Sequence, residues 1–258
     1  MGIYNCEETL AESLDSLLNQ SFRDFEVIMC DDGSIDNTLR IAKNYCDRWP
    51  ERFKLILNEK NKGLNFTLNR CLSRATGEYI ARMDGDDISL PQRFSLQVMF
   101  LDENPEFSIV SSPMLYFDET GVWGKGNSIE KPSKVDYIKG TPFAHGPCMV
   151  RREAYEAVGG YTIDDSLLRV EDYHLWIKMG EKGLFGYNLQ KHLYMMRDDK
   201  NAEKRRNFRG RLNEAHVKYL AFKKLKLPYR YIFFVVKPIL IGVLPKVFYR
   251  YLHSNRLK

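Results

Sequence analysis

The chain has 258 residues, of which 44% are hydrophobic and 28% are charged, so it is long enough for a large core and too apolar for general disorder. Its five cysteines are an odd number with no CxxC pair, which argues against a disulfide framework or a zinc site and predicts free thiols. The net charge of +5 is unevenly distributed. Residues 197–258 hold 17 Lys/Arg and 4 Asp/Glu, whereas the rest of the chain holds 22 Lys/Arg and 30 Asp/Glu. The acidic body suggests a metal site, and the basic end suggests contact with an anionic surface such as lipid headgroups or nucleic acid.

The first half of the chain alternates helical and extended patterns. Apolar spacing predicts helices over 7–20, from about 36, and over 64–75, with buried strands at 25–30, 53–57 and 78–83. This alternation predicts an α/β fold with a mostly parallel sheet and helices on both faces. Only residues 1–4 are available for a strand ahead of the first helix, so we expect the first strand to be truncated at its amino end.

The second half is less regular. Strands are expected within 107–112, 114–117 and 148–152, followed by a short helix that stops at Gly159-Gly160. Another helix opens at Glu171-Asp172, and a long basic helix is expected over 200–226. We therefore predict one domain over 1–197 and a basic, amphipathic helical tail over 198–258.

Acidic clusters follow two of the predicted strands, at Asp31-Asp32 and at Asp84, Asp86 and Asp87. In open parallel sheets, ligands bind beyond the carboxyl ends of the strands, so both clusters are expected on one rim. An Asp-x-Asp pattern suits a hard divalent cation, since Mg²⁺ typically takes one or two carboxylates plus substrate phosphates. Such a cation would neutralise charge on a leaving diphosphate.

Other interpretations of the three aspartates are weaker. An EF-hand loop starting at Asp84 would need glycine at position 89 and glutamate at 95, where this sequence has Ser89 and Ser95. The acids would also serve as caps for a helix beginning near Pro91, although one acid would suffice for that. The phosphate-binding patterns GxxxxGK[ST] and GxGxxG are absent, so a nucleotide would be held by metal and strand ends.

Five segments in order resemble glycosyltransferase family 2 with the GT-A fold. They are MGIYN, CDDGSIDNT, NKGLNFTLN, GEYIARMDGDD and GGYTIDDSLLRVEDYHLWIKM, and the likeness covers residues 1 to about 197. The resemblance implies an inverting enzyme that moves a sugar from a nucleoside-diphosphate sugar, with UDP favoured, to an acceptor hydroxyl. It also implies a divalent metal, Mg²⁺ or Mn²⁺.

The resemblance implies a donor site near the first strand, the DDGS turn and the Asp-x-Asp turn. Metal binding carries over to Asp86, with Asp84 in support. For Asp31 and Asp32 the plainer alternative is an ordinary turn and helix cap, and for Lys62 it is a solvated loop charge. The nucleotide-sugar contacts implied are Gly2, Tyr4, Asn5, Asp31, Asp32, Lys62, Gly63, Arg82 and Asp84.

The acceptor side is implied by the Glu171-Asp172 pair. By resemblance Asp172 is the general base, and a neighbouring Glu171 would raise the pKa of Asp172 by like-charge repulsion. The alternative is that both acids only favour a helix N-terminus electrostatically. His145 occupies a position that often lines the acceptor site in the family, but a surface histidine is as good an interpretation.

The tail places Phe208, Leu212, Ala215, Tyr219 and Phe222 at nearly helical spacing among basic residues, which predicts an amphipathic helix. Residues 231–245 would span only about 22 Å as a helix, short of the ~30 Å bilayer core, and its prolines at 238 and 245 would break it. We expect residues 203–250 to lie on a membrane surface. The alternative is that they pack on the domain as a hydrophobic cap. Nucleic acid is not expected as a partner.

These patterns together predict a cytoplasmic glycosyltransferase, peripheral on the inner face of the cell membrane, that builds a cell-surface polysaccharide or glycolipid. Its acceptor would be a saccharide or a lipid-linked saccharide. Two other classes stay open: a sugar nucleotidyltransferase, which usually carries a basic glycine-rich loop, and a catalytically silent membrane-bound scaffold.

Overall fold

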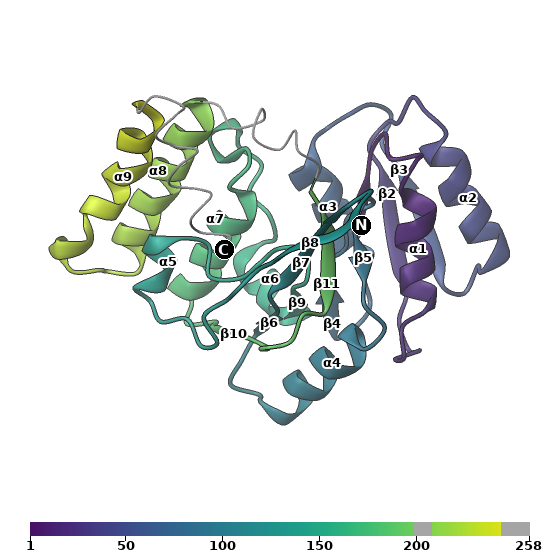
Figure 1. Ribbon diagram of the computed structural model, residues 1–258, viewed down its shortest axis with the longest axis horizontal. Coiled ribbons are helices and arrows are strands. Elements are labelled where there is room, and N and C mark those ends of the chain that lie inside the picture. The colour runs from purple at the N-terminus through teal and green to yellow at the C-terminus, as the bar shows by residue number, and fades with distance from the viewer. Residues whose placement is uncertain (199–207, 244–258) are drawn as a thin grey trace.

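The structure is a computed structural model that describes residues 1–198 and 208–243, and its strands form three small sheets (Figure 1). The first sheet is parallel throughout, in the order β1-β2-β3. Helix α3 packs on β1 and β2, and α1 packs on α2. This confirms the predicted strand–helix alternation. The elements are β1 (Gly2–Ile3), α1 (Leu10–Leu18), β2 (Val27–Asp31), α2 (Thr38–Arg48), β3 (Phe53–Leu57) and α3 (Leu64–Leu72).

The second sheet has the order β10-β6-β9-β4, in which β9 runs antiparallel to both of its neighbours. Helices α6 and α7 pack together behind it. The glycine pair after α6 ends that helix as predicted, with Gly159 in the left-handed conformation. The elements are β4 (Tyr79–Ala81), α4 (Arg93–Glu103), β6 (Ile109–Ser111), β9 (Met149–Arg151), α6 (Arg152–Val158), η1 (Asp165–Leu167), α7 (Glu171–Glu181) and β10 (Gly186–Asn188).

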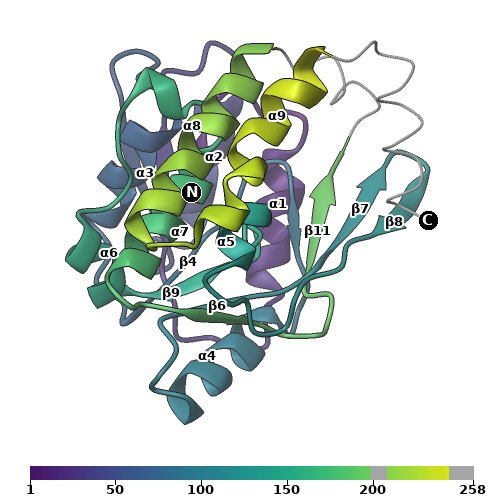
Figure 2. The same cartoon turned by 90° about the vertical axis from the view of Figure 1, so that its left-hand side faces the viewer.

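The third sheet has the order β5-β11-β7-β8; β5 packs on α1, while β7 and β8 lie on the side away from α6 and α7 (Figure 2). Of its strands, the sequence predicted only β7, because β5 is two residues long and β8 contains two glycines. Both facts weaken an apolar strand signal. The elements are β5 (Ile88–Ser89), β7 (Met114–Asp118), β8 (Gly121–Lys125), the short helix α5 (Asp136–Lys139) that follows the hairpin, and β11 (Tyr194–Arg197).

The helices after the sheets pack on the domain. Helix α8 (Phe208–Lys224) contacts α5 and α7, and it continues through η3 (Tyr229–Tyr231) into α9 (Phe233–Val243). Val217 and Ala221 are buried in the same core as Trp176. None of the described helices is long and apolar enough to cross a membrane. Residues 200–207 of the predicted basic helix lie outside the described residues.

One detail of the tail prediction is wrong, namely the break at Pro238. Of the residues that define the predicted amphipathic pattern, Phe208, Leu212 and Tyr219 are 43–50% exposed. The inward face carries Asn213 and Lys218 as well as small apolar residues. Pro238 lies inside α9 instead of ending it, at the loss of one backbone hydrogen bond.

Two large apolar clusters and a small one form the core. One large cluster surrounds the fully buried Trp176, and the other lies between the first sheet and α1. The small cluster is Ile28, Cys30 and Cys71. All five cysteines are free thiols, as expected. Arg93 is also fully buried, and its guanidinium donates to the carbonyl oxygens of Arg82 (2.8 Å) and Cys148 (3.0 Å). Arg93 thereby ties the end of β4 to the start of β9, next to the candidate site.

Candidate active site

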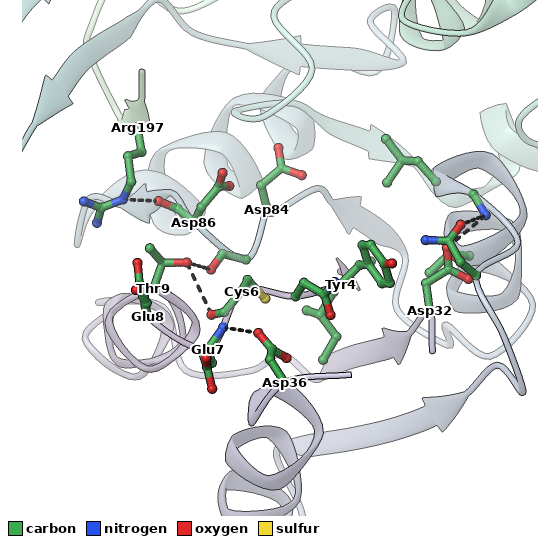
Figure 3. A pocket seen from close by; sticks show the side chains of 18 residues that line it. Tyr4, Cys6, Glu7, Glu8, Thr9, Asp32, Asp36, Asp84, Asp86 and Arg197 are labelled. Atoms are coloured by element: carbon green, nitrogen blue, oxygen red, sulfur yellow. Dashed lines mark hydrogen bonds between the residues drawn. The ribbon is translucent and has the colours of Figure 1, made fainter. Parts of the chain in front are cut away.

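A cavity of about 750 Å³ opens where β1 and β2 end, bounded by the start of α3 and the turn after β4 (Figure 3). Segments from four parts of the chain meet there, as the rule for parallel strand ends requires. Figure 3 shows Tyr4, which is 46% exposed, between Asp32 on one wall and Asp84 and Asp86 on the other. The predicted donor and metal residues that line the cavity are Gly2, Tyr4, Asn5, Asp32, Gly63, Asp84 and Asp86.

The end of β1 is tied to the turn after β2. The Asn5 amide donates to Ser34 Oγ (3.1 Å), and Asn5 Oδ1 accepts from the amide of Ile35 (3.0 Å). The Asp31 carboxylate accepts from Ser34 through both the amide (3.2 Å) and the hydroxyl (2.5 Å). Asp31 is buried and does not line the cavity, so in this structure it shapes the turn, as the plainer interpretation held.

Asp32 reaches the cavity while being almost fully buried. Its carboxylate accepts from Asn58 Nδ2 (2.7 Å) and from the backbone amides of Lys62 (2.8 Å) and Gly63 (2.9 Å). Lys62 therefore contributes its backbone, whereas its side chain is exposed and does not line the cavity. Gly63 has a φ of +88°, a conformation that favours glycine, and this brings its amide to Asp32.

The turn after β4 is held from behind, so that its carboxylates face the cavity. Ser13 Oγ donates to the Asp84 carbonyl (2.8 Å), and Thr9 Oγ1 donates to the Gly85 carbonyl (2.9 Å). Asp87 points inward, where it accepts from the Arg197 amide (2.8 Å), and burial followed by the charge of Asp86 raises the pKa of Asp87 to about 6.

The aspartates do not cap the helix that follows them. The first turn of α4 is capped from elsewhere, because the amide of Phe94 donates to Gln20 Oε1 (3.1 Å). This leaves Asp84 and Asp86 available to the cavity.

The cavity has the composition of a cation site. Six carboxylates line it, and within the described part of the chain Arg197 is the one lysine or arginine among the lining residues. The described ranges contain no group of three His, Cys, Asp or Glu side chains placed to hold a metal. Mg²⁺ is usually bound by one or two carboxylates, with phosphate and water as the remaining ligands. The residues present therefore fit a metal ion that binds together with a phosphate-bearing substrate.

Arg197 is a site residue that the sequence did not reveal. It comes from β11, where its Nε donates to the Asp86 carbonyl (3.0 Å), and its guanidinium pairs with the Glu12 carboxylate. The group also lies over the Phe117 ring, 4.5 Å from the centroid. Its position 111 residues from Asp86 depends on the pairing of β11 with β5, which no local pattern predicts.

Arg82 connects this cavity to the predicted acceptor side. It is 7% exposed and pairs with the Asp84 carboxylate, but it does not line the donor cavity. Its Nε has no hydrogen-bond partner among the described residues. Its charge lowers the pKa values of both Asp172 and His145, which places the three groups in one neighbourhood.

Asp172 lies at the amino end of α7, and its pKa is raised to about 6, chiefly by burial and secondly by Glu171. The predicted like-charge effect is therefore present but is the smaller cause. Glu171 Oε2 is buried without a hydrogen-bond partner among the described residues. Helix-terminus stabilisation alone would keep such an acid at an ordinary pKa, so the arrangement suits a carboxylate that accepts a proton near neutral pH.

His145 is partly buried and belongs to a hydrogen-bonded network. Its Nε2 lies 2.7 Å from Tyr161 Oη, which lies 3.3 Å from Tyr155 Oη. The imidazole also meets the edge of the Trp176 ring at a centroid distance of 6.1 Å. Burial and the charge of Arg82 lower the pKa of His145 well below its ordinary value, so this imidazole is neutral at pH 7.

The sequence profile described as "Glycosyl transferase family 2" matches residues 1–159. The chain belongs to glycosyltransferase family 2. Glycosyl transfer is therefore its class of activity. One relative of this family-2 glycosyltransferase is EpsE of Bacillus subtilis (strain 168), which is provisionally named a glycosyltransferase. The two chains are 46% identical over 257 residues, and the alignment covers 100% of this chain and 92% of EpsE.

A second relative, from Escherichia coli, is named UDP-Gal:alpha-D-GlcNAc-diphosphoundecaprenol beta-1,3-galactosyltransferase. It is 28% identical over 257 residues, covering 96% of this chain and 91% of its own. Among solved structures, S. aureus TarS 1-349 in complex with UDP-GlcNAc has a TM-score of 0.71 at 20% identity and covers 94% of this chain and 70% of that one. PcManGT, a mannosyltransferase from Pyrobaculum calidifontis solved with GDP-Man and Mn²⁺, has a TM-score of 0.66 at 19% identity, covering 93% and 66%. These likenesses show that the family-2 chain has the GT-A fold.

Proposed function

We propose that the protein is an inverting, metal-dependent transferase that moves a sugar from a UDP-sugar to a saccharide hydroxyl. The observation that carries this proposal is the pairing of an acid-lined cavity at the strand ends with the partly buried carboxyl group of Asp172, whose pKa is raised to about 6. Arg82 is linked to both, because it pairs with Asp84 and its charge acts on Asp172. UDP is favoured because the E. coli relative is named for UDP-Gal and TarS was solved with UDP-GlcNAc.

The donor would lie with its base against Tyr4 and Asp32 and with its diphosphate toward Asp84 and Asp86. Tyr4 offers an exposed ring for stacking, and the Asp32 carboxylate is held in place by three donors so that it can accept from a uracil N–H. Asp84 and Asp86 would hold a divalent cation, which supplies charge neutralisation for the departing diphosphate when it is bound. Arg197 stands at the same wall as a second positive charge.

The transfer itself needs one base. The acceptor oxygen attacks C1 of the sugar, the bond from C1 to the diphosphate oxygen breaks, and the hydroxyl proton passes to a carboxylate oxygen of Asp172. With a pKa near 6, Asp172 is mostly ionised at pH 7 and remains a better base than an ordinary aspartate. The products are the inverted glycoside and UDP.

The acceptor is proposed to be a lipid-linked saccharide at the inner face of the membrane, in the assembly of a cell-surface polysaccharide or glycolipid. The E. coli relative is named for a diphosphoundecaprenol acceptor. Helix α9 and the turn before it expose large apolar side chains beside basic ones, an arrangement typical of helices that lie in a membrane interface. The exposed residues are Tyr229, Ile232, Phe233, Val236 and Leu240.

Calorimetric titration with UDP, GDP, UDP-sugars and GDP-mannose, with and without Mn²⁺, tests the donor proposal. We expect one nucleotide to bind only with the metal, and Asp86→Ala to weaken that binding by at least roughly tenfold. Glu8→Gln is the matched control, because it removes a negative charge from the same cavity at a residue outside the Asp84–Asp86 turn. Equal weakening by both substitutions, or metal-independent binding, would contradict the assignment.

Product analysis separates the remaining classes. Glycosyl transfer releases UDP, whereas a nucleotidyltransferase would release pyrophosphate. A silent scaffold would bind no nucleotide while remaining folded.

A further inference from the structure

Tyr194, the first residue of β11, is fully buried and is not one of the residues that line the donor cavity. Its backbone is fixed on both sides, because it pairs antiparallel with Ser89 of β5 and parallel with Met114 of β7. The third sheet therefore sets the position of this side chain from outside the cavity.

The Tyr194 hydroxyl group bonds to both ends of the turn after β4, residues 84–87. The Asp84 amide donates to Tyr194 Oη (3.3 Å), which is the one hydrogen-bond partner of that amide among the described residues. The hydroxyl also bonds to the Asp87 carboxylate, which in addition accepts from the Arg197 amide (2.8 Å). A tyrosine hydroxyl has one proton to donate and can accept at the same time, so a single group can serve both ends of the turn.

Two neighbours fix the ring that carries this hydroxyl. The guanidinium of the fully buried Arg93 lies 5.0 Å from the Tyr194 ring centroid and donates to the Gly146 carbonyl (3.2 Å). A Cβ added at Gly146 would lie 2.7 Å from Tyr194 Cε1 and 3.1 Å from the hydroxyl oxygen. Gly146 does not have a positive φ, so the ring, and not the backbone conformation, leaves no room for a side chain at this position.

The carboxylates proposed to hold the metal project from the same turn. Asp84 and Asp86 face the donor cavity (Figure 3). The carbonyl groups of the turn are held by hydroxyl groups of α1 and its N-cap, whereas the Asp84 amide is held by Tyr194. Residues that hold metal ligands in place typically contribute about 10–100-fold to metal affinity. A hydroxyl that bonds to both ends of the turn is placed to set the relative position of its two ligands.

We propose that Tyr194 is a positioning residue for the metal: its hydroxyl group holds the turn so that the carboxylates of Asp84 and Asp86 bind one cation together. This inference rests on the proposed metal-dependent function and adds to it a residue that lies outside the cavity. Because the hydroxyl does not line the cavity, its loss should raise the metal concentration that the site needs without changing the contacts to the nucleotide.

Tyr194→Phe removes the hydroxyl group and keeps the ring. Calorimetric titration of the full chain with UDP at increasing Mn²⁺ gives the Mn²⁺ concentration at half-maximal UDP binding. We expect Tyr194→Phe to raise that concentration by roughly tenfold or more, and to change the UDP affinity at saturating Mn²⁺ by less than about threefold. A merely structural defect would instead lower the number of binding sites and leave the Mn²⁺ midpoint unchanged.

The matched control is Tyr45→Phe. Tyr45 is also buried, and its hydroxyl donates to a carboxylate, that of Asp15 (2.6 Å), between α2 and α1. This variant should leave the Mn²⁺ midpoint unchanged. Amide hydrogen exchange in the metal-free protein is the second readout: the Asp84 amide should exchange at least about tenfold faster in Tyr194→Phe and at the parent rate in Tyr45→Phe.

Gly146→Ala displaces the same hydroxyl from another segment of the chain. We expect it to raise the Mn²⁺ midpoint as well. The double variant with Tyr194→Phe should raise the midpoint no further than the larger of the two single effects, since both substitutions act through one hydroxyl group.

An unchanged Mn²⁺ midpoint or an unchanged Asp84 amide in Tyr194→Phe would overturn the inference and leave the proposed function in place. So would equal shifts of the midpoint in Tyr194→Phe and Tyr45→Phe. A parent chain that binds UDP at no Mn²⁺ concentration would contradict the proposed function, and the metal role of Tyr194 would be lost with it.

Discussion

The Asp172 carboxyl group costs the folded protein stability when it is ionised, because burial raises its pKa from 3.8 to about 6. The folded state favours the neutral acid, so this contribution is favourable below the unfolded pKa and is lost as pH rises through about 6. We expect Asp172→Asn to abolish most transfer activity while raising the free energy of unfolding at pH 8 by about 2–3 kcal/mol. Urea denaturation across pH 4–8 measures this.

The stability gain should shrink toward zero at pH 4, where the wild-type carboxyl group is protonated in the folded state. Asp165→Asn, on the exposed turn that precedes α7, is the control and should change stability by less than about 0.5 kcal/mol at either pH. A gain that is equal at both pH values would show that the effect is not electrostatic.

The residues predicted from the sequence were those that follow apolar strands. Asp32, Asp84 and Asp86 were located because the ends of parallel strands share a rim, and the structure brings them to one cavity. Arg197 was missed because its place there depends on a pairing between segments far apart in the chain. The contacts of His145 were also out of reach, since the nearby sequence does not reveal that its ring meets Tyr161 and Trp176.

At the scale of elements, the turn after α6 holds the Tyr161 backbone against α3. Asn69 Nδ2 donates to the Tyr161 carbonyl (2.8 Å), and the Tyr161 amide donates to Asn69 Oδ1 (2.8 Å). Gly159 and Gly160 both have positive φ, but only at Gly160 would a Cβ meet Asn69 Oδ1, at 2.6 Å. Substituting the two glycines separately therefore distinguishes the effect of backbone strain from the effect of losing the Asn69 contact.

We expect Gly159→Ala to destabilise the protein by about 1 kcal/mol through strain alone and Gly160→Ala by about 2–4 kcal/mol. Gly160→Ala should also lower kcat, because Tyr161 holds the ring of His145, a predicted acceptor-site residue, by a 2.7 Å hydrogen bond. Urea denaturation and steady-state kinetics check both effects. Equal destabilisation by the two substitutions would show that the Asn69 contact contributes nothing.

The existence of α8 was predicted, but its inward face was not. Periodicity arguments assign lysine to solvent, whereas Lys218 is 3% exposed and donates to the Lys139 carbonyl (3.3 Å) while pairing with Glu214 (3.1 Å). A hydrogen-bond partner on another element can thus turn a lysine toward the core, although hydrophobicity alone would place it on the solvent side of the helix. The short strands β5 and β10 were missed for a related reason, since their pairing partners define them.

At the scale of the whole molecule, the tail combines the two alternatives drawn from the sequence. Helix α8 packs on the domain, while α9 and the preceding turn expose a row of large apolar side chains. We expect the protein to bind vesicles that contain anionic lipid and the triple substitution Phe233→Ser, Val236→Ser, Leu240→Ser to weaken that binding at least roughly tenfold. Co-sedimentation with vesicles of 30% anionic lipid measures it.

The control removes an exposed apolar residue from elsewhere. Ile35→Ser, at a side chain that is 89% exposed beside the donor cavity, should leave vesicle binding unchanged. If the triple variant binds as the parent does, the exposed surface of α9 is not the membrane contact.

The pairing of β11 with β5 has a consequence for when the enzyme can first work. The Asp84–Asp87 turn receives hydrogen bonds from Arg197, about 110 residues later in synthesis, while the partners within the first sheet lie less than 30 residues apart. The first sheet can therefore form on a ribosome-bound chain long before the Asp84–Asp87 turn is held in place. A nascent chain would stay inactive until Arg197 has left the exit tunnel, so a growing polypeptide could not consume donor before its acceptor side is complete.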